Sequence, residues 1–356
     1  MARKILLGML IFVPAAIAAD LLHASPILVF VLSALGIIPL ADLIGEGTEE
    51  LAAHTGPKLG GLLNATLGNA AELIITIFAI RQGLLALVLA SITGSILGNL
   101  LLVSGLSMVV GGIRNGSQTF DRKQAGQNAT LLVLAVVALV IPSLFSRAID
   151  PLVNANLPSE RLLSEGVAFV IIILYVLSIL YSFTNREETP ITQTPPPMHE
   201  AKWSVAQSLG VLVAATVGVA VLSEFLVGAV EPVVTSLGLT EFFLGIIVIP
   251  IIGNIAEHLV AVEVASKNNM ELSLAISLGS GLQIALFVAP LLVFISLFFG
   301  HTLLLVFTDL ELIALFSASL VITFISLDGE SNWLEGAMLL AVYLLIGVAY
   351  FFLPAA

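Results

Sequence analysis

Cysteine is absent from the 356 residues of this chain, and charged residues make up only 10% of it. Without cysteine the chain can form neither disulfides nor thiolate metal sites, so a metal ion must be bound by oxygen atoms or histidine nitrogens. The 12 Lys and Arg residues form no basic run, which leaves no surface suited to nucleic acid. The H-E-x-x-H motif is also missing, and together with the lack of cysteine this argues against an enzyme.

Hydrophobic residues are correspondingly abundant, at 59% of the chain, and the mean hydropathy is +1.13. A soluble protein has about a quarter of its residues charged, so the composition predicts an integral membrane protein in a lipid bilayer. Helices are the expected spanning elements, because a helix satisfies its own backbone hydrogen bonds in lipid. Hydropathy predicts an all-α protein with about 11 transmembrane helices, near residues 5–22, 26–45, 60–81, 85–111, 126–146, 162–184, 205–230, 241–266, 270–298, 302–327 and 332–353.

The N-terminal stretch, residues 1–22, is the first of these predicted helices. It also has the pattern of a signal peptide, but we expect it to remain as an extra transmembrane helix. If Arg3 and Lys4 are cytoplasmic, nine of the 12 Lys and Arg residues fall on the cytoplasmic side of the predicted topology. The sequence therefore predicts a multi-pass protein of the cell (plasma) membrane with a cytoplasmic N-terminus.

One short motif occurs twice. Gly68-Asn69-Ala70-Ala71-Glu72 reappears 185 residues later as Gly253-Asn254-Ile255-Ala256-Glu257, and the same offset relates seven further residue pairs in the spans that follow. A constant offset through two successive hydrophobic segments indicates that a multi-helix unit has been duplicated.

This duplication divides the chain into two halves. We expect a first five-helix repeat at residues 23–184, a cytoplasmic linker rich in proline at 185–202, and a second five-helix repeat at 203–356. The two motifs fall on the third and eighth predicted spans, and an odd separation reverses the direction of a helix through the bilayer. The halves are therefore predicted to be inverted-topology repeats, which place a central site between them.

The acid of each motif is expected near the middle of the membrane. Glu72 lies about 18 Å into its predicted span, and Glu257 somewhat further into a longer one. A carboxylate at that depth costs several kcal/mol unless it is protonated, paired or bound to a cation, so an intramembrane acid predicts function. The alternative is a protonated, hydrogen-bonded glutamic acid with a structural role.

Neutral oxygen ligands accompany both acids. Asn69 and Asn254 belong to the motifs themselves, and Ser95, Ser280, Asn99 and Gln283 lie on the adjacent predicted spans. Glycine before each Asn, and Pro250 in the second copy, predict helices loosened at the motif, where backbone carbonyls can also bind a cation. The alternative is that the glycines serve packing and that the serines bond to their own backbone or to a neighbouring helix.

This ligand set consists of hard oxygen atoms, which suit Ca²⁺ or Mn²⁺. Two carboxylates balance one divalent cation. Burial favours the neutral form of a carboxyl group and a bound cation favours the charged form, so each acid holds either a proton or the metal. Alternating exposure of such a site predicts exchange of a cation for protons, with both ions as substrates and with no resident cofactor.

Other ionisable residues are candidates for supporting roles. His258 follows Glu257 directly, and we interpret it either as a packed residue or as a gate or proton relay. Glu46, together with Glu49 and Glu50, lies in the segment 45–61, which reads as a solvated loop or as a vestibule that collects cations.

Two further acids are placed by the same reasoning. Glu231 is related to Glu46 by the 185-residue offset, and Glu241 begins a predicted span about 24 Å from Glu257. Glu241 is too distant to share the central ion, so it could line only an ion entrance. Asp309 and Glu311 fall near a span end and are expected to be solvated.

Four sequence blocks carry a family resemblance. They are GNAAELI at Gly68 to Ile74, SITGSILGNLLLVSG at Ser91 to Gly105, GNIAEHLVAV at Gly253 to Val262 and SLGSGLQIALFVAP at Ser277 to Pro290. With these blocks in order, the chain resembles the CAX family of calcium/proton antiporters and looks like a short prokaryotic-type member. The linker is less acidic than in many members of that family.

The resemblance implies an eleven-helix cation/Ca²⁺-exchanger fold and export of cytoplasmic Ca²⁺ in exchange for H⁺. It implies that Glu72 and Glu257 bind ion and proton, with support from Asn69, Asn254, Ser95, Ser280, Asn99 and Gln283, and a gating or proton role for His258. The alternatives are a Mn²⁺/H⁺ or Na⁺/Ca²⁺ exchanger on the same scaffold and, from a different class, a cation channel. Association into a homo-oligomer is left open.

Overall fold

The computed structural model describes residues 2–149, 158–184 and 201–353, and these residues form the predicted all-α membrane protein. In this described part, nine helices are long and apolar enough to cross a membrane. The predicted number of about 11 spans remains a prediction, because the predicted spans 60–81 and 302–327 fall on shorter helices, namely α4, α5 and α16, defined below. Most of the predicted linker, residues 185–200, lies outside the described residues.

The first half of the chain begins with two short helices and a long one. Its elements are α1 (Ala2–Met9), α2 (Phe12–Leu21), α3 (Pro26–Thr55), α4 (Pro57–Leu67), α5 (Ala70–Arg81), α6 (Leu85–Leu97), the π-helix η1 (Gly98–Val103), α7 (Ser104–Asn115), α8 (Arg122–Ile149) and α9 (Pro158–Thr184).

The second half contains two further π-helices. Its elements are α10 (Val205–Gly228), α11 (Val230–Leu237), α12 (Glu241–Phe243), η2 (Leu244–Val248), α13 (Ile249–Ser266), α14 (Met270–Gln283), η3 (Ile284–Val288), α15 (Ala289–Ser296), α16 (Asp309–Ile325) and α17 (Trp333–Phe351). Two short strands, β1 (Gln118–Thr119) and β2 (Glu330–Ser331), pair antiparallel and join the two halves at one end.

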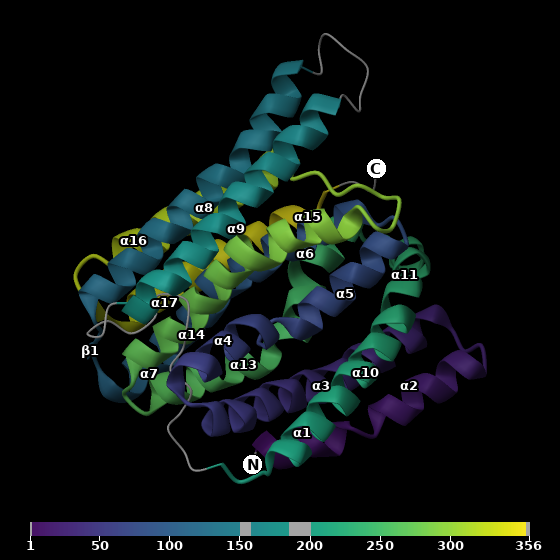
Figure 1. Cartoon of the computed structure of the whole chain (residues 1–356), viewed down its shortest axis with the longest axis horizontal. Helices are drawn as coiled ribbons and strands as arrows, with labels where there is room; N and C mark the ends of the chain where they lie inside the picture. Colours follow the sequence, from purple (N-terminus) through teal and green to yellow (C-terminus); the bar gives the residue numbers. More distant parts are fainter. Residues whose placement is uncertain (1, 150–157, 185–200, 354–356) are drawn as a thin grey trace.

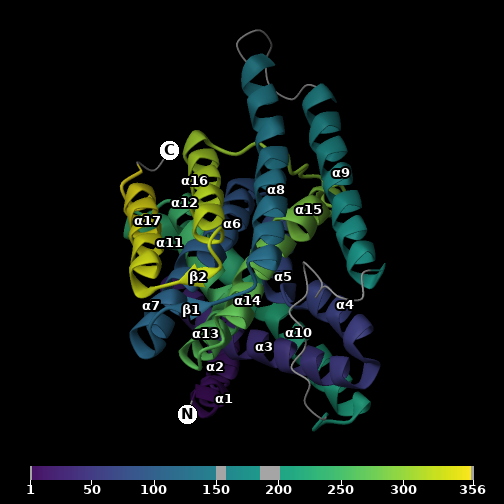
Figure 2. The ribbon, with the colours of Figure 1, turned by 90° about the vertical axis from the view of Figure 1, so that its left-hand side faces the viewer.

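The helices surround a central group that carries both motifs. Helices α3 and α10 pack side by side with α1 and α2 on one side of the molecule (Figure 1). Helices α8, α9 and α16 lie on the opposite side, where α8 and α9 project beyond their neighbours, and the view in Figure 2 gives the same order. Helices α5, α13 and α14 run between these two groups.

The segment 45–61 is mostly helical, so the solvated loop that was one alternative for it was wrong. Helix α3 continues to Thr55, so Glu46, Glu49 and Glu50 lie on its last turns. Glu50 is 3% exposed, and its Oε2 accepts hydrogen bonds from the backbone N–H groups of Lys202 at 2.7 Å and Trp203 at 3.0 Å. The start of the second half is the partner that lets this acid lie buried in a helix.

Residues 301–308 are extended, although a helix was expected from residue 302. Serine hydroxyls from other helices satisfy the backbone: Ser296 accepts from the N–H of Leu303 at 2.9 Å, Ser164 from Leu305 at 3.2 Å and Ser143 from Phe307 at 2.9 Å. Helix α16 then begins at Asp309, behind a capping box of Thr308 and Glu311. Contacts from distant helices decide this segment, and hydropathy does not reveal them.

Helix α6 packs very closely on η2. A Cβ placed on Gly245 would lie 2.5 Å from the Cβ of Ala90, and one placed on Gly94 would collide with the carbonyl oxygen of Ile246. Pro250 has no N–H to donate to that carbonyl, four residues earlier, and the π-helix absorbs the irregularity. Small residues therefore bring the backbones of the two repeats together next to the motifs.

Candidate ion-binding site

The two motifs sit at the centre of the molecule but in different backbone settings. Gly68 and Asn69 form a turn between α4 and α5, and Asn69 has non-helical dihedrals of φ −98° and ψ 21°. Helix α13, in contrast, continues through Gly253 and Asn254. The loosened helix predicted for both motifs is thus present in the first and absent from the second, where the irregularity lies upstream in η2.

Each acid packs against the glycine of the other repeat. A Cβ placed on Gly253 would lie 2.7 Å from Cγ of Glu72, and a Cβ placed on Gly68 would lie 3.2 Å from Oε1 of Glu257. These reciprocal contacts are what an inverted pair of repeats produces around its axis. They bring Glu72 and Glu257 into one region, as the sequence analysis expected.

Hydroxyl and amide donors engage both carboxylates. Oε1 of Glu72 accepts hydrogen bonds from the hydroxyl of Ser95 and, at 2.5 Å, from Nδ2 of Asn254. Ser280, which is the counterpart of Ser95, lies within hydrogen-bond reach of Glu257 as well as of Asn69, and its single hydroxyl proton can serve one of them at a time. Both serines therefore bond to groups outside their own helices.

The remaining amides form a network across the two repeats. Nδ2 of Asn69 donates to Oε1 of Gln283 at 2.8 Å, and the hydroxyl of Ser280 donates to Oδ1 of Asn69 at 3.2 Å. Nδ2 of Asn99 lies 3.2 Å from the hydroxyl of Ser280 and 3.0 Å from the backbone carbonyl oxygen of Ser95, and it donates to both, which links this network to Glu72 and Asn254. All eight predicted ligand residues thus belong to one connected group.

Several buried oxygen atoms in this group have no hydrogen-bond partner in the described part of the chain. They are Oε2 of Glu72, Oε2 of Glu257, Oδ1 of Asn99 and Oδ1 of Asn254. A buried polar atom without a partner costs about 1–3 kcal/mol, so a cluster of four calls for an explanation. All four are hard oxygens, the kind of ligand atom that Ca²⁺ prefers.

The two acids differ in how far they are buried. Glu72 is 3% exposed, whereas Glu257 is only partly buried. His258 is 8% exposed, and among the described residues its Nε2 has no hydrogen-bond partner. The side chain of Glu72 is therefore more deeply buried than that of Glu257, although Oε2 of each carboxylate is buried.

The acids predicted to line an entrance lie in three places. Glu46 on α3 forms an ion pair with Arg3 at 2.5 Å. Glu231 on α11 and Glu241 at the start of α12 interact electrostatically with each other. Glu49 lies one turn along α3 from Glu46, near enough to Glu257 for their like charges to repel. Its clustering with Glu46 was the only signal in the sequence.

Glu311 was expected to be solvated, and this was wrong. It is 0% exposed, and its Oε1 accepts a hydrogen bond from the hydroxyl of Thr93 at 3.3 Å. Its Oε2 accepts from the backbone N–H and the hydroxyl of Thr308, both at 2.8 Å. The Thr308/Glu311 spacing of a capping box was the available signal. Glu311 ties α16 to α6 two residues from Ser95.

Comparisons with known proteins agree with this geometry. The family model described as sodium/calcium exchanger protein matches residues 25–184 and 207–352. The Ca(2+)/H(+) antiporter of Aphanothece halophytica is 43% identical over 366 residues, covering 99% of this chain and 97% of the relative. The Ca(2+)/H(+) antiporter ChaA of Bacillus subtilis is 44% identical over 346 residues, covering 96% and 97%.

A solved structure has a closely similar fold. The structure of native YfkE superimposes with a TM-score of 0.85 at 42% sequence identity, and the match covers 99% of this chain and 100% of that one.

Proposed function

Because this chain belongs to the sodium/calcium exchanger protein family, we propose that it is a secondary active antiporter that exchanges cytoplasmic Ca²⁺ for H⁺. Two relatives named Ca(2+)/H(+) antiporters match this chain at 43% and 44% identity, and each match extends over almost the whole length of the relative. We place the protein in the plasma membrane with its N-terminus in the cytoplasm, in line with the distribution of its Lys and Arg residues.

One observation carries the proposal: two acids from opposite repeats meet in one buried group that holds four unpartnered oxygen atoms. Two carboxylates neutralise a divalent cation, whereas a monovalent ion would leave one negative charge uncompensated in a low-dielectric surrounding. Amide and hydroxyl oxygens complete a set of hard ligands. Ca²⁺ is cargo here, and the proposal requires no resident cofactor.

The coupling follows from competition at Glu72 and Glu257. Ca²⁺ binds to the carboxylates only after they release their protons, and protons rebind only after Ca²⁺ leaves. Since the two forms cannot coexist at one site, a change of exposure that carries Ca²⁺ one way carries protons the other way. The amides of Asn69, Asn99, Asn254 and Gln283, together with the hydroxyl of Ser280, support the acids, and the hydroxyl of Ser95 donates to Glu72.

His258 and the peripheral acids receive secondary roles in this proposal. His258 adjoins Glu257 in a buried position and acts as a gate or proton relay. Glu46 and Glu49 attract cations on the α3 side, and Glu231 and Glu241 do so on the other side.

The test is ⁴⁵Ca²⁺ uptake into proteoliposomes with an imposed pH gradient. We expect uptake that collapses on addition of a protonophore, and complete loss of exchange in Glu72→Gln and in Glu257→Gln. These variants keep the side-chain size and remove the charge. Glu263→Gln is the matched control, because Glu263 lies on the same helix as Glu257 but is exposed and pairs with Lys267 at 2.6 Å.

Other results would contradict the proposal. Full exchange in either central variant would exclude the shared site. Uptake that follows a Na⁺ gradient, and not the pH gradient, would indicate a Na⁺/Ca²⁺ exchanger. Flux that persists without any counter-ion gradient would indicate a channel, and preference for Mn²⁺ over Ca²⁺ in competition would change the cargo.

A further inference from the structure

Glu311 on α16 is a buried acid that the exchange mechanism does not use. It is 0% exposed, and none of the ion pairs among the described residues includes it. Its carboxylate instead accepts three hydrogen bonds, one from the hydroxyl of Thr93 and two from the backbone N–H and the hydroxyl of Thr308. Glu311 also lies in the first turn of α16, where the helix dipole favours a negative charge. These contacts fit the charged form, which is costly to bury and therefore calls for a role.

The hydrogen bond from Thr93 holds helix α6 beside its contact with the second repeat. Helix α16 packs on α6 (Figure 2), and Thr93 directly precedes Gly94, where a Cβ would collide with the carbonyl oxygen of Ile246 in η2. Residues two apart point to nearly opposite sides of a helix. Glu311 therefore holds α6 from one side while Ser95, on the other side, donates to Glu72.

The second repeat lacks this hydrogen bond. The counterpart of Thr93, 185 residues later, is Leu278 on α14, which has no hydroxyl. The counterpart of Glu311 lies on α8 and follows from burial, because the buried residues of the two helices recur with the same spacing. This spacing aligns Asn128, Ala129 and Leu132 of α8 with Glu311, Leu312 and Leu315 of α16.

Asn128 and Leu278 also lie together, as inverted repeats require. Both line a void of about 10 Å³ between α8 and α14, and Oδ1 of Asn128 has no hydrogen-bond partner in the described part of the chain. The first repeat has a hydroxyl that donates to a carboxylate at this place. The second repeat has a leucine next to an unsatisfied amide oxygen.

This difference acts on the balance between the two states of an alternating carrier. In a carrier built from inverted repeats, the second state exchanges the conformations of the two repeats, so the contact of α6 with η2 opens there. A hydrogen bond that exists in only one of two states favours that state. We propose, on the basis of the proposed function, that Glu311 is a positioning residue for exchange. Through Thr93 it holds α6 closed, and because α14 has no equivalent bond, the carrier is biased towards the state seen here.

The KM for Ca²⁺ at the two faces of the membrane tests the proposal. The apparent KM at one face is inversely related to the fraction of carrier open to that face, so the ratio of the two KM values follows the balance between the states. Thr93→Val keeps the side-chain shape and removes the donor. A hydrogen bond to a charged group contributes a factor of about ten or more, and at 3.3 Å this one is long. We therefore expect the ratio to change about tenfold in Thr93→Val and to recover in Thr93→Ser, measured by ⁴⁵Ca²⁺ uptake into inside-out and right-side-out vesicles.

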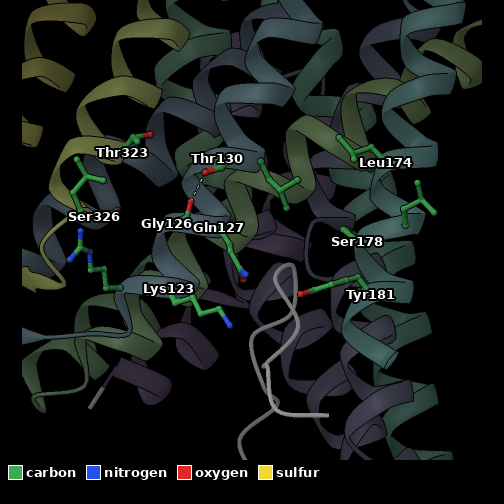
Figure 3. Close-up of a pocket in the computed structure, with 13 residues that line it drawn as sticks. Lys123, Gly126, Gln127, Thr130, Leu174, Ser178, Tyr181, Thr323 and Ser326 are labelled. Atoms are coloured by element: carbon green, nitrogen blue, oxygen red, sulfur yellow. Dashed lines mark hydrogen bonds between the residues drawn. The ribbon is translucent and has the colours of Figure 1, made fainter. Parts of the chain in front are cut away.

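Glu311→Gln tests the other partner of the bond. Glutamine also serves in a capping box, so α16 keeps its first turn while the bond to Thr93 becomes a neutral one. We expect a change of about threefold in the same direction. Thr323→Val is the control on α16, because Thr323 lines the groove next to α8 and α9 (Figure 3) and its hydroxyl donates to the carbonyl of Ser319 in its own helix at 2.6 Å.

Leu278 allows the reciprocal experiment. In the opposite state α14 takes the position that α6 has now, where a hydroxyl at residue 278 would reach Oδ1 of Asn128. Threonine and valine have the same shape, so Leu278→Thr compared with Leu278→Val isolates the hydroxyl. We expect the ratio of KM values to differ about threefold between these variants, in the direction opposite to that of Thr93→Val.

Three results would overturn the proposal. An unchanged ratio in Thr93→Val and Glu311→Gln, with lower maximal rates at both faces and a lower unfolding temperature in detergent, would make the bond purely structural. A shift in the same direction from Leu278→Thr and Thr93→Val would show that the bond does not distinguish the states. Equal ratios in the two variants of Leu278 would mean that this pair does not cause the bias. A parent protein without Ca²⁺/H⁺ exchange at either face would contradict the proposed function itself, before any variant is compared.

Discussion

The two repeats share a sequence motif but pack around it differently. Gly94 on α6 faces the backbone of Ile246 so closely that a Cβ there would collide with it. Its counterpart 185 residues later, Gly279 on α14, has no described atom within 4 Å of the same position. One copy of the contact is closed, and the other is open.

The acids show the same asymmetry. Glu72, beside the closed contact, is 3% exposed, while the side chain of Glu257 is only partly buried. A carrier with alternating access holds its site shut on one side and open on the other. Under the proposed function, the structure is one of two states, and the opposite state closes α14 onto α4 as α6 is now closed onto η2.

The substitution Gly279→Ala tests this comparison and is expected to have the largest effect on exchange. The added methyl group fits the present state, but in the opposite state Gly279 would meet a backbone as Gly94 does now. We expect normal folding and Ca²⁺ binding with exchange reduced about 100-fold, which corresponds to a clash near the upper end of overpacking costs. Binding is measured by calorimetry in detergent and exchange by ⁴⁵Ca²⁺ uptake.

The mirror variant provides the internal control. Gly94→Ala collides in the present state, so we expect a lower unfolding temperature as well as lost exchange. Gly210→Ala, at an open and exposed site, should change neither quantity. Wild-type exchange in Gly279→Ala would show that α14 never closes and would break the two-state interpretation.

A second comparison concerns the two motif asparagines. Asn254 donates to the carboxylate of Glu72 and keeps an unpartnered Oδ1, whereas Asn69 uses both ends of its amide on Gln283 and Ser280. A hydrogen bond to a charged group contributes about twice as much as one between neutral groups. We therefore expect Asn254→Ala to raise the KM for Ca²⁺ about tenfold and Asn69→Ala about threefold.

Uptake kinetics over a range of Ca²⁺ concentrations measure this difference. Asn128→Ala is the matched control, because Asn128 on α8 is another buried asparagine whose Oδ1 has no described partner. A larger effect of Asn69→Ala than of Asn254→Ala would mean that the site is centred on the first motif, not on Glu72 and Asn254.

The sequence predicted the membrane fold, the duplication and the grouping of Glu72 with Glu257. Hydrophobic spans, acids within them and a constant offset between repeated residues can all be read directly from the sequence. It did not predict that, of the two motifs, only the first interrupts a helix at its Gly and Asn. In the second copy the irregularity near Pro250 lies before the motif, in η2. Nor could it show that Asn69 pairs with Gln283, a contact 214 residues away. Burial of Glu50 and Glu311 likewise depends on partners supplied by distant segments.

The prediction with the smallest expected effect concerns a difference between the outer helices of the two halves. Helix α8 of the first half begins at Arg122 just after β1, but α16 of the second half follows the extended residues 301–308. Ser143 on α8 holds this segment, accepting from the N–H of Phe307 and donating to the carbonyl of Leu305 at 3.3 Å.

Ser143→Ala leaves the buried N–H of Phe307 without that partner, so we expect about 1–3 kcal/mol of lost stability with exchange retained. Thermal unfolding in detergent measures the loss. Thr130→Ala, on the same helix, is the control, because Thr130 is exposed and bonds only to the carbonyl of Gly126. A Ser143→Ala protein as stable as the parent would mean that the extended segment is held by its buried side chains Leu303, Leu305 and Phe307, and that the serine hydroxyls merely accompany it.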